Sequence, residues 1–336
     1  MTDNHVIIIA EAGVNHNGDM AMARRMVAEA RKAGADYVKF QTAVPELVIS
    51  AFAPKAEYQK ETTGSAQSQL EMCKAIHLPL SAYAELKELC DSEGIGFMST
   101  PFDLVSVDCL APLGMDYWKI PSGEITNLPY LRKIGALGGK IIMSTGMATL
   151  DEVAAAVDVI EKAGTPRSSI YLLHCTTQYP APLASVNLRA MDALAALGCA
   201  GVGYSDHTVG TGVAVAAVGR GACIVEKHFT LDRTLPGPDH RASLEPDELA
   251  ELVRAIRDTE LALGSPEKTA CDAERPNIEV ARKSIVAMRD IKAGEILSDE
   301  NITVKRPGNG ISPMLWDSVI GQVAPRDFGT DELIEL

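Results

Sequence analysis

The sequence predicts a (β/α)₈ barrel followed by a small, mostly β domain. Three observations support this prediction. Eight short apolar runs each precede a stretch with helical periodicity, and together they fill about 260 residues, the usual size of such a barrel. A doubly wound sheet would need a glycine-rich first turn, which the chain lacks. After Gly264 the long helical patterns stop and short alternating segments begin.

The eight apolar runs are rich in Val, Ile, Tyr or Phe and are too short for helices. We therefore expect buried parallel strands. They span residues 6–13, 37–42, 96–102, 117–124, 140–146, 169–176, 202–208 and 223–230.

Helical periodicity follows the runs, most clearly over residues 20–34, 149–164 and 245–264. Thr149 and Glu152 have the spacing of a capping box, and Gly164 is placed to end that helix.

Three domain segments follow from these patterns. The barrel takes residues 1–265, a polar linker takes 266–282, and the small β domain takes 283–336. The interval 43–95 is longer than one strand–helix unit requires, so residues 43–70 are expected to form an inserted loop over the barrel mouth.

Charge and composition exclude several classes of function. A net charge of −14 argues against non-specific binding to nucleic acid or to an anionic membrane, because both need excess Lys and Arg. The N-terminal segment lacks a basic region and a long apolar run, so no signal peptide or membrane span is expected. The 7 cysteines form no CxxC pair. Scattered thiols indicate a cytoplasmic protein.

Polar side chains gather where the predicted strands end, and in this architecture the carboxyl ends of strands form the active site. A strand also becomes polar simply on leaving the core, but charged groups at six ends suggest a shared pocket. These residues are Glu11, Lys39, Gln41, Ser99, Thr100, Lys119, Ser122, Glu124, Ser144, Ser205, Asp206, His207, Glu226, Lys227 and His228.

His207 and His228 end neighbouring strands, which lie about 4.8 Å apart, so one metal ion could bind both imidazoles. Two nitrogen ligands without a thiolate favour Mn²⁺ or Mg²⁺ over structural zinc.

Lys119 is accompanied by hydroxyls at four other strand ends. One cation with several hydroxyl donors suits the oxygens of a phosphate. Because the chain has no Walker loop, a nucleotide phosphate is not expected. The hydroxyls belong to Thr100, Ser122, Ser144 and Ser205.

Ten motifs spread from Ile7 to the C-terminus resemble the sialic acid synthase family with its C-terminal antifreeze-like (SAF) domain. They are AEAGVNHNGD, VKFQT, STPFD, KIPSGEITNLPYL, STGMAT, LLHCTTQYPAP, YSDHTVG, EKHFTLD, PGPDHRAS and VKRPGNGISP.

This resemblance implies that phosphoenolpyruvate condenses with an open-chain N-acetylated mannose-type sugar and water, giving a nonulosonic acid and phosphate. Mn²⁺ or Mg²⁺ would bind His207 and His228 and polarise the sugar aldehyde. Phosphoenolpyruvate would bind Lys119, Thr100, Ser122, Ser144 and Ser205. The sugar would bind Glu11, Lys39, Gln41, Tyr179 and Asp239, and either Glu124 or Glu11 would activate the water.

The resemblance also implies a homodimer in which Arg306 of the antifreeze-like domain reaches the partner's pocket and binds the N-acetyl group. Two asparagines found in some members are replaced, one near Gly64 and one by Thr177.

The expected sugar is N-acetylmannosamine, and the alternative is the 2,4-diacetamido-trideoxy sugar of legionaminate synthases. Two more distant hypotheses are a Schiff-base aldolase with Lys119 as its nucleophile and a non-catalytic sugar- or ice-binding protein.

Overall fold

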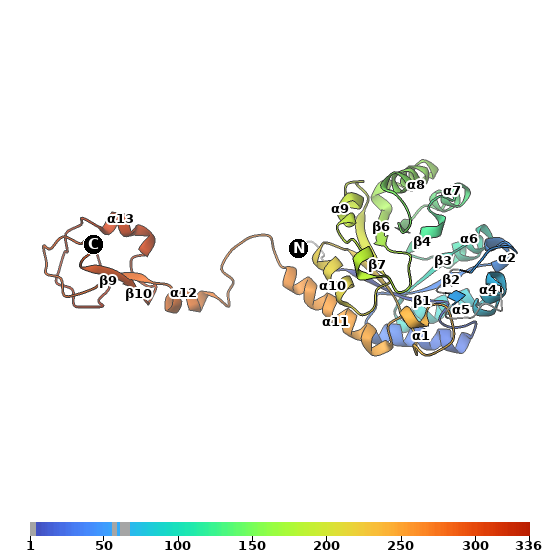
Figure 1. Ribbon diagram of the computed structural model, residues 1–336, viewed down its shortest axis with the longest axis horizontal. Helices are drawn as coiled ribbons and strands as arrows, with labels where there is room; N and C mark the ends of the chain where they lie inside the picture. The colour runs from blue at the N-terminus through green and yellow to red at the C-terminus, as the bar shows by residue number, and fades with distance from the viewer. Residues whose placement is uncertain (1–4, 56–58, 61–67) are drawn as a thin grey trace. The chain divides into compact units, whose positions relative to one another are not determined.

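Eight parallel strands form one sheet in the order β3-β2-β1-β8-β7-β6-β5-β4 in the computed structural model. Strands β3 and β4, at the two ends of this order, lie side by side, so the sheet forms a nearly closed barrel (Figure 1). The predicted (β/α)₈ fold is therefore confirmed. The strands are β1 (Ile7–Gly13), β2 (Tyr37–Thr42), β3 (Gly96–Pro101), β4 (Tyr117–Ile120), β5 (Lys140–Ser144), β6 (Ile170–Cys175), β7 (Gly201–Asp206) and β8 (Ile224–His228).

The structure describes residues 5–55, 59–60 and 68–336, and the chain divides into two compact units, Met1–Gly264 and Ser265–Leu336. Most strand ends lie within two residues of the predicted bounds. Strand β4 is the exception, because it ends at Ile120 and the chain then forms a 3₁₀ turn over Ser122–Glu124.

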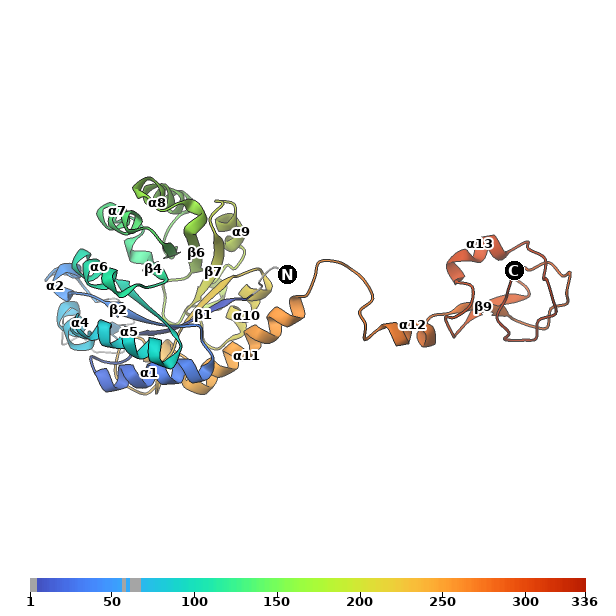
Figure 2. The same ribbon diagram turned by 180° about the vertical axis from the view of Figure 1, so that it is seen from behind.

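Helices surround the barrel on its outer side, as Figure 2 shows from behind. Thr149 and Glu152 form the predicted capping box at the start of α8, and Gly164 caps its C-terminal end. The helices of this unit are α1 (Met20–Ala33), α2 (Pro45–Val48), α4 (Gln69–Ile76), α5 (Ala82–Glu93), α6 (Leu104–Leu110), α7 (Leu128–Leu137), α8 (Leu150–Ala163), α9 (Ala190–Ala195), α10 (Gly212–Gly219) and α11 (Pro246–Leu263).

Apolar side chains form a layer inside the barrel. Successive residues of a strand face opposite sides, so positions two apart share the interior. This layer is a buried cluster of Ile9, Met98, Tyr117, Ile142, Leu173 and Ile224. On β7 the equivalent residue is Gly203, where a Cβ atom would lie only 2.6 Å from the Leu173 side chain. The barrel is therefore filled at this level.

Polar residues occupy the next inward-facing position on the same strands, two residues further along. We call them the first polar layer: Glu11, Lys39, Thr100, Lys119, Ser144, Cys175, Ser205 and Glu226. The apolar layer beneath them forms the floor of a pocket that opens at the carboxyl ends of the strands.

The second unit contains an antiparallel pair, β9 (Ser284–Ala287) and β10 (Ile302–Lys305), with helices α12 (Arg275–Ala281) and α13 (Trp316–Val319). Further bridges join Ile291 to Phe328 and Ile296 to Val323. Its core is small and separate: Ile285, Ala287, Ile291, Leu297, Ile302, Val319, Ala324, Phe328 and Ile334.

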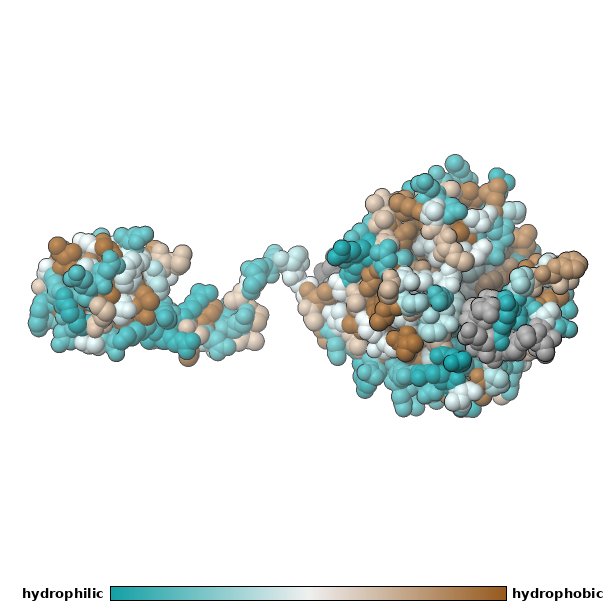
Figure 3. All heavy atoms as spheres, viewed as in Figure 1, coloured by the Kyte–Doolittle hydropathy of each residue, from teal (hydrophilic) through white to brown (hydrophobic). Residues whose placement is uncertain are grey.

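The surface of the barrel unit intermixes hydrophobic and hydrophilic residues on the face seen in Figure 3. Within the described ranges, no helix combines the length and the apolar character needed to cross a membrane.

Candidate active site

A cavity of about 280 Å³ opens at the carboxyl ends of the barrel strands. It brings together residues from all eight strands and from the loops after β1, β3, β4, β6, β7 and β8. Among the residues expected to form the site, those that line it are Glu11, Lys39, Gln41, Thr100, Lys119, Ser122, Ser144, Tyr179, Ser205, His207, His228 and Asp239.

One side of the cavity is a network of buried charges, which we call the lysine side: Glu11, Lys39, Lys119 and Glu226 with the hydroxyls of Thr100 and Ser144. Lys39 Nζ lies 2.6 Å from Glu11 Oε2 and 3.7 Å from Glu226 Oε2. Lys119 Nζ lies 4.0 Å from Glu226 Oε1 and donates a hydrogen bond of 2.6 Å to Ser144 Oγ. Glu226 thus lies between the two lysines.

The pKa values on the lysine side follow from burial and from these neighbours. Burial, together with the charge of Glu226, raises the pKa of Glu11 to about 7, although Lys39 opposes the shift. Burial also disfavours ionised Glu226, but Lys119 and Lys39 outweigh it and lower the Glu226 pKa to about 2. Burial lowers the pKa of Lys119. On the lysine side opposite charges therefore lie next to one another, and Glu226 ionises more readily than Glu11.

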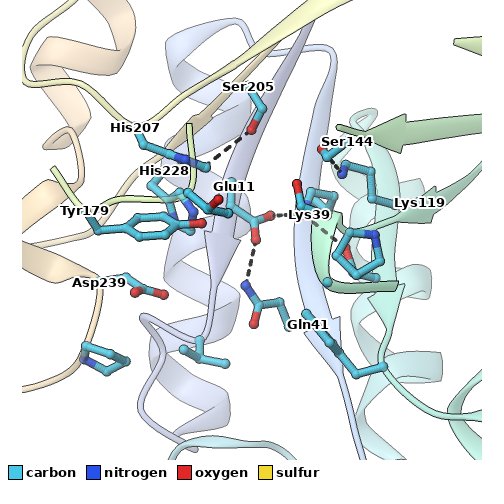
Figure 4. Close-up of a pocket in the computed structure, with 18 of the residues that line it drawn as sticks. Glu11, Lys39, Gln41, Lys119, Ser144, Tyr179, Ser205, His207, His228 and Asp239 are labelled. Atoms are coloured by element: carbon cyan, nitrogen blue, oxygen red, sulfur yellow. Dashed lines mark hydrogen bonds and ion pairs between the residues drawn. The ribbon is translucent and has the colours of Figure 1, made fainter. Parts of the chain in front are cut away.

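The opposite side contains His207, His228, Tyr179 and Asp239, and we call it the histidine side (Figure 4). The two imidazole centroids are 5.5 Å apart, and the Tyr179 ring lies 4.2 Å from that of His207. Burial lowers the pKa of both histidines, so both rings are neutral and can act as nitrogen ligands. Burial raises the pKa of Asp239 to about 6.

The histidine side fits a divalent cation that takes further ligands from water or substrate. His207 Nδ1 lies 2.7 Å from the Thr176 carbonyl oxygen, an interaction that leaves Nε2 available. Nδ1 of His228 is buried and has no hydrogen-bond partner in the described part of the chain. No group of three or more His, Cys, Asp or Glu residues placed to hold a metal occurs among the described residues.

Ser205 connects the two sides. Its hydroxyl donates to Glu226 Oε1 at 3.0 Å and lies 3.5 Å from His207 Nε2. Ser122 lies at the edge of the lysine side, where its hydroxyl accepts a hydrogen bond of 2.9 Å from the Gly146 amide.

Gln41 and Gly13 complete the pocket around Glu11. Gln41 Nε2 donates to Glu11 Oε1 at 3.0 Å. Gly13 has φ +54°, and a Cβ atom there would lie 3.3 Å from both of these atoms. The backbone conformation and the close approach of Gln41 together favour glycine at this position.

Two residues that were given a role in the site do not line this cavity, and neither do Ser99, Asp206 and Lys227 of the predicted strand-end residues. Glu124 lies in the 3₁₀ turn after β4, and its carboxylate accepts a hydrogen bond from Asn127. The strand was expected to continue to Glu124, but it ends at Ile120. Arg306 belongs to the second unit, where its Nε donates to the Ala281 carbonyl oxygen.

Several lining residues were not assigned roles from the sequence. Glu226 was noted only as a strand-end residue, although its place two residues before His228 puts both on the same face of β8. Helix α4 contributes Met72, Cys73 and Ile76 to the wall. Thr177, one of the two replaced asparagines, lines the cavity as well, whereas the other replacement, near Gly64, lies outside the described residues.

Comparison with known proteins identifies the family. The NeuB family model matches residues 26–268, and the SAF domain model matches residues 282–335. The chain belongs to the NeuB family. The resemblance inferred from the motifs is therefore confirmed.

Individual relatives cover nearly the whole chain. It is 52% identical to the N,N′-diacetyllegionaminic acid synthase of Campylobacter jejuni over 98% of both chains. It is 48% identical to the protein of the same name from Legionella pneumophila, covering 94% of this chain and 89% of that protein. The solved structure of an N-acetylneuraminic acid (sialic acid) synthetase from Leptospira borgpetersenii, in complex with citrate, is similar with a TM-score of 0.72 and 35% identity, over 82% of this chain and 90% of that one.

These relatives show that the chain is an enzyme of the transferase type. The hypothesis of a non-catalytic binding protein is therefore wrong.

Proposed function

We propose that the enzyme condenses phosphoenolpyruvate with open-chain 2,4-diacetamido-2,4,6-trideoxymannose to give N,N′-diacetyllegionaminate and phosphate. The observation that carries the reaction class is a single pocket with two buried lysines on one side and two neutral histidines on the other. The identities of 52% and 48% to legionaminic acid synthases, against 35% to a sialic acid synthetase, support this sugar over N-acetylmannosamine.

Phosphoenolpyruvate would bind at the lysine side. Its phosphate alone carries about −1.5 to −2 charge, and its carboxylate adds one more. Lys119 and Lys39 supply the cations, and Thr100, Ser122, Ser144 and Ser205 supply hydroxyl donors around them. Because Glu226 offsets one lysine, these groups do not balance the substrate charge by themselves.

A divalent cation, Mn²⁺ or Mg²⁺, held by His207 and His228 would add the missing positive charge. When bound, it would act as a Lewis acid toward the aldehyde oxygen of the sugar. The neutral histidines, with the buried unpartnered Nδ1 of His228, support this assignment.

The protein's own groups would align the reactants and move protons. C3 of phosphoenolpyruvate forms a bond to the aldehyde carbon of the sugar, water adds at C2, and phosphate leaves by C–O cleavage. Of the two carboxylates expected to act on the water, Glu11 lines the pocket and has a pKa of about 7. A group with that pKa can accept and return a proton at neutral pH, so we assign this role to Glu11.

The cavity wall formed by α4 suits the diacetamido-trideoxy sugar, which lacks one hydroxyl that N-acetylmannosamine carries at C6. Met72, Cys73 and Ile76 of this helix line the cavity. Burial raises the pKa of the Cys73 thiol to about 11, so it stays uncharged. The trideoxy sugar carries a methyl group in place of a hydroxymethyl group, and burying one methyl contributes about 0.8 kcal/mol. Gln41, Tyr179 and Asp239 would bind the polar groups of the sugar.

We include a homodimer in the proposal. Arg306 belongs to the second unit and would bind the N-acetyl group in the pocket of the partner chain. The small core of that unit supports a role in which it is stabilised by docking on another chain.

Phosphate release from phosphoenolpyruvate, measured with the two sugars side by side, tests the proposal. We expect kcat/KM to be clearly higher with the diacetamido-trideoxy sugar. A higher value with N-acetylmannosamine would reject the proposed sugar, and no phosphate with either sugar would reject the reaction class. Activity that survives EDTA, together with borohydride trapping of a substrate on Lys119, would instead support the Schiff-base aldolase.

A further inference from the structure

We propose that Asp206 and Lys227 are positioning residues that hold His207 and His228 at the separation a shared divalent cation needs. Each of them is the direct chain neighbour of one histidine. The inference rests on the metal-binding role that the proposed function gives to the two histidines.

Asp206 and Lys227 form a buried ion pair between β7 and β8. They are paired in the register of these strands, and Lys227 Nζ lies 2.7 Å from Asp206 Oδ2. The side chains are 0% and 1% exposed respectively. The same ammonium donates a hydrogen bond of 2.5 Å to the Thr208 carbonyl oxygen. One lysine on β8 therefore binds the residues on both sides of His207.

A second set of bonds closes a turn around His207. The Thr208 amide and hydroxyl both donate to Asp206 Oδ1, at 2.9 Å and 2.8 Å. This turn lies just beyond the end of β7, and the strand ladder with β8 stops at Asp206 and Lys227. Backbone pairing with β8 therefore does not reach His207, whose carbonyl oxygen instead accepts a hydrogen bond of 2.8 Å from the Ala181 amide in the loop after β6, whereas His228 is the last residue of β8. The side-chain hydrogen bonds of Asp206, Thr208 and Lys227 hold the turn around His207, which the β7–β8 ladder does not reach.

The pair acts from outside the pocket. Inward and outward residues alternate along a strand, so Asp206 and Lys227 face away from the interior that Ser205, Glu226 and His228 share. Neither residue is among those that line the cavity. Any influence on the reaction therefore passes through the residues next to them.

Stability alone is a weak reason for such a pair. Removing two charges from water is costly, and well-packed apolar residues of similar volume are often as stable or more stable. An ion pair with three further hydrogen bonds provides something an apolar contact does not, namely a fixed distance and direction between two strand ends.

Mn²⁺ binding to the full-length, metal-free protein tests the inference. The double variant Asp206→Asn/Lys227→Met leaves no unpaired charge and keeps an acceptor for Thr208. We expect Mn²⁺ affinity, measured from free Mn²⁺ by electron paramagnetic resonance, to fall about tenfold or more, as for other residues that orient metal ligands. Thermal unfolding and circular dichroism, measured in parallel, verify that the variant is folded.

Two controls separate positioning from general stability. Arg257→Met breaks ion pairs to Asp36 (2.9 Å) and Glu260 (2.7 Å), well away from the histidine turn. It should lower the melting temperature and leave Mn²⁺ affinity unchanged. His228→Ala should abolish binding, which ties the signal to this site.

A folded double variant with wild-type Mn²⁺ affinity would overturn the inference. A wild-type protein that does not bind Mn²⁺ would instead contradict the metal assignment in the proposed function. If the double variant does not fold, Thr208→Val removes only the 2.8 Å hydroxyl bond of the same turn. We expect a loss of a few-fold there, and no loss would also overturn the inference.

Discussion

The lysine side and the histidine side of the pocket differ in whether their buried polar groups have partners. On the lysine side each buried charge has a partner, and Glu226 contacts both lysines. On the histidine side the rings are neutral, and one buried ring nitrogen has no partner among the described residues. In the proposed function, an anion at the first side would replace existing contacts, whereas the second side would offer ligand atoms to a cation and a neutral sugar.

The two sides also differ in how they could compensate the charge of a bound ligand. A compensated network binds an anion only if the added charge is balanced, and in the proposed function the cation held at the histidine side would add that balance. The two sides therefore depend on each other, and substitutions on each side should affect different kinetic constants.

The largest effect is expected on the histidine side. His228→Ala should lower turnover at least about a thousandfold, because a Lewis-acid metal contributes several kcal/mol to the transition state. Phosphate release and Mn²⁺ binding should be lost together. His174 on β6 provides a matched control, since its Nε2 contacts the Val186 carbonyl oxygen and it does not line the pocket. Full activity of His228→Ala in metal-free buffer would contradict the assignment.

On the lysine side, Lys119→Met should raise the KM for phosphoenolpyruvate about 10- to 100-fold, as expected for a charged hydrogen bond worth about 1.5–3 kcal/mol. The KM for the sugar should change little. Lys140, exposed at the first residue of β5, is the matched control for loss of a lysine. An unchanged KM for phosphoenolpyruvate in Lys119→Met would contradict the proposal that this substrate binds at the lysine side.

A third experiment tests whether Arg306 of one chain acts on the histidine side of the partner chain's pocket. Arg306→Ala should raise the KM for the sugar about tenfold, the effect of one lost charged hydrogen bond, and leave that for phosphoenolpyruvate nearly unchanged. Mixed dimers of Arg306→Ala and His228→Ala chains should regain about one intact site. The neighbouring Lys305, which pairs with Asp331, provides a control substitution. Mixed dimers without recovery would show that Arg306 does not act across the interface.

The smallest effect concerns Asp239, whose pKa is about 6 because of burial. Between the unfolded value of 3.8 and this value, the native state holds more protons than the unfolded state, so stability falls as pH rises. Asp239→Asn should remove about 1 kcal/mol of the decline between about pH 5 and pH 7, measured by urea unfolding. Asp232→Asn, exposed on the same loop, should leave this decline in place. A decline that persists in Asp239→Asn would mean that the buried carboxyl is not its source.

Much of the site could be predicted because this fold brings the carboxyl ends of all its strands together at one end of the barrel. Once eight strands were recognised, residues at their ends had to meet, and strand-end residues such as Lys39, Lys119 and His228 line one cavity. The bounds of β1 and β2 agree with the apolar runs within one residue, since buried parallel strands need continuous apolar sequence.

The remaining features depend on contacts that periodicity does not encode. The position of Glu226 between two lysines combines residues from three strands, and only their distances reveal it. Glu124 was expected at a strand end, but the Pro-containing segment after Ile120 turns the chain early. Helix α4 follows an interval that reads only as a long loop, so its contribution to the wall could not be predicted.

The apolar floor of the barrel has a consequence for the order of events during turnover. With the interior filled below the first polar layer, ligands enter and leave through the mouth alone. The lysine side belongs to that deeper layer. His207, just after β7, and His228, at the end of β8, each lie two residues nearer the mouth than Ser205 and Glu226. A sugar bound at the mouth would block access to the lysines. In the proposed function, phosphoenolpyruvate would therefore bind before the sugar, and phosphate released at the lysines would leave only after the path past the histidines is clear.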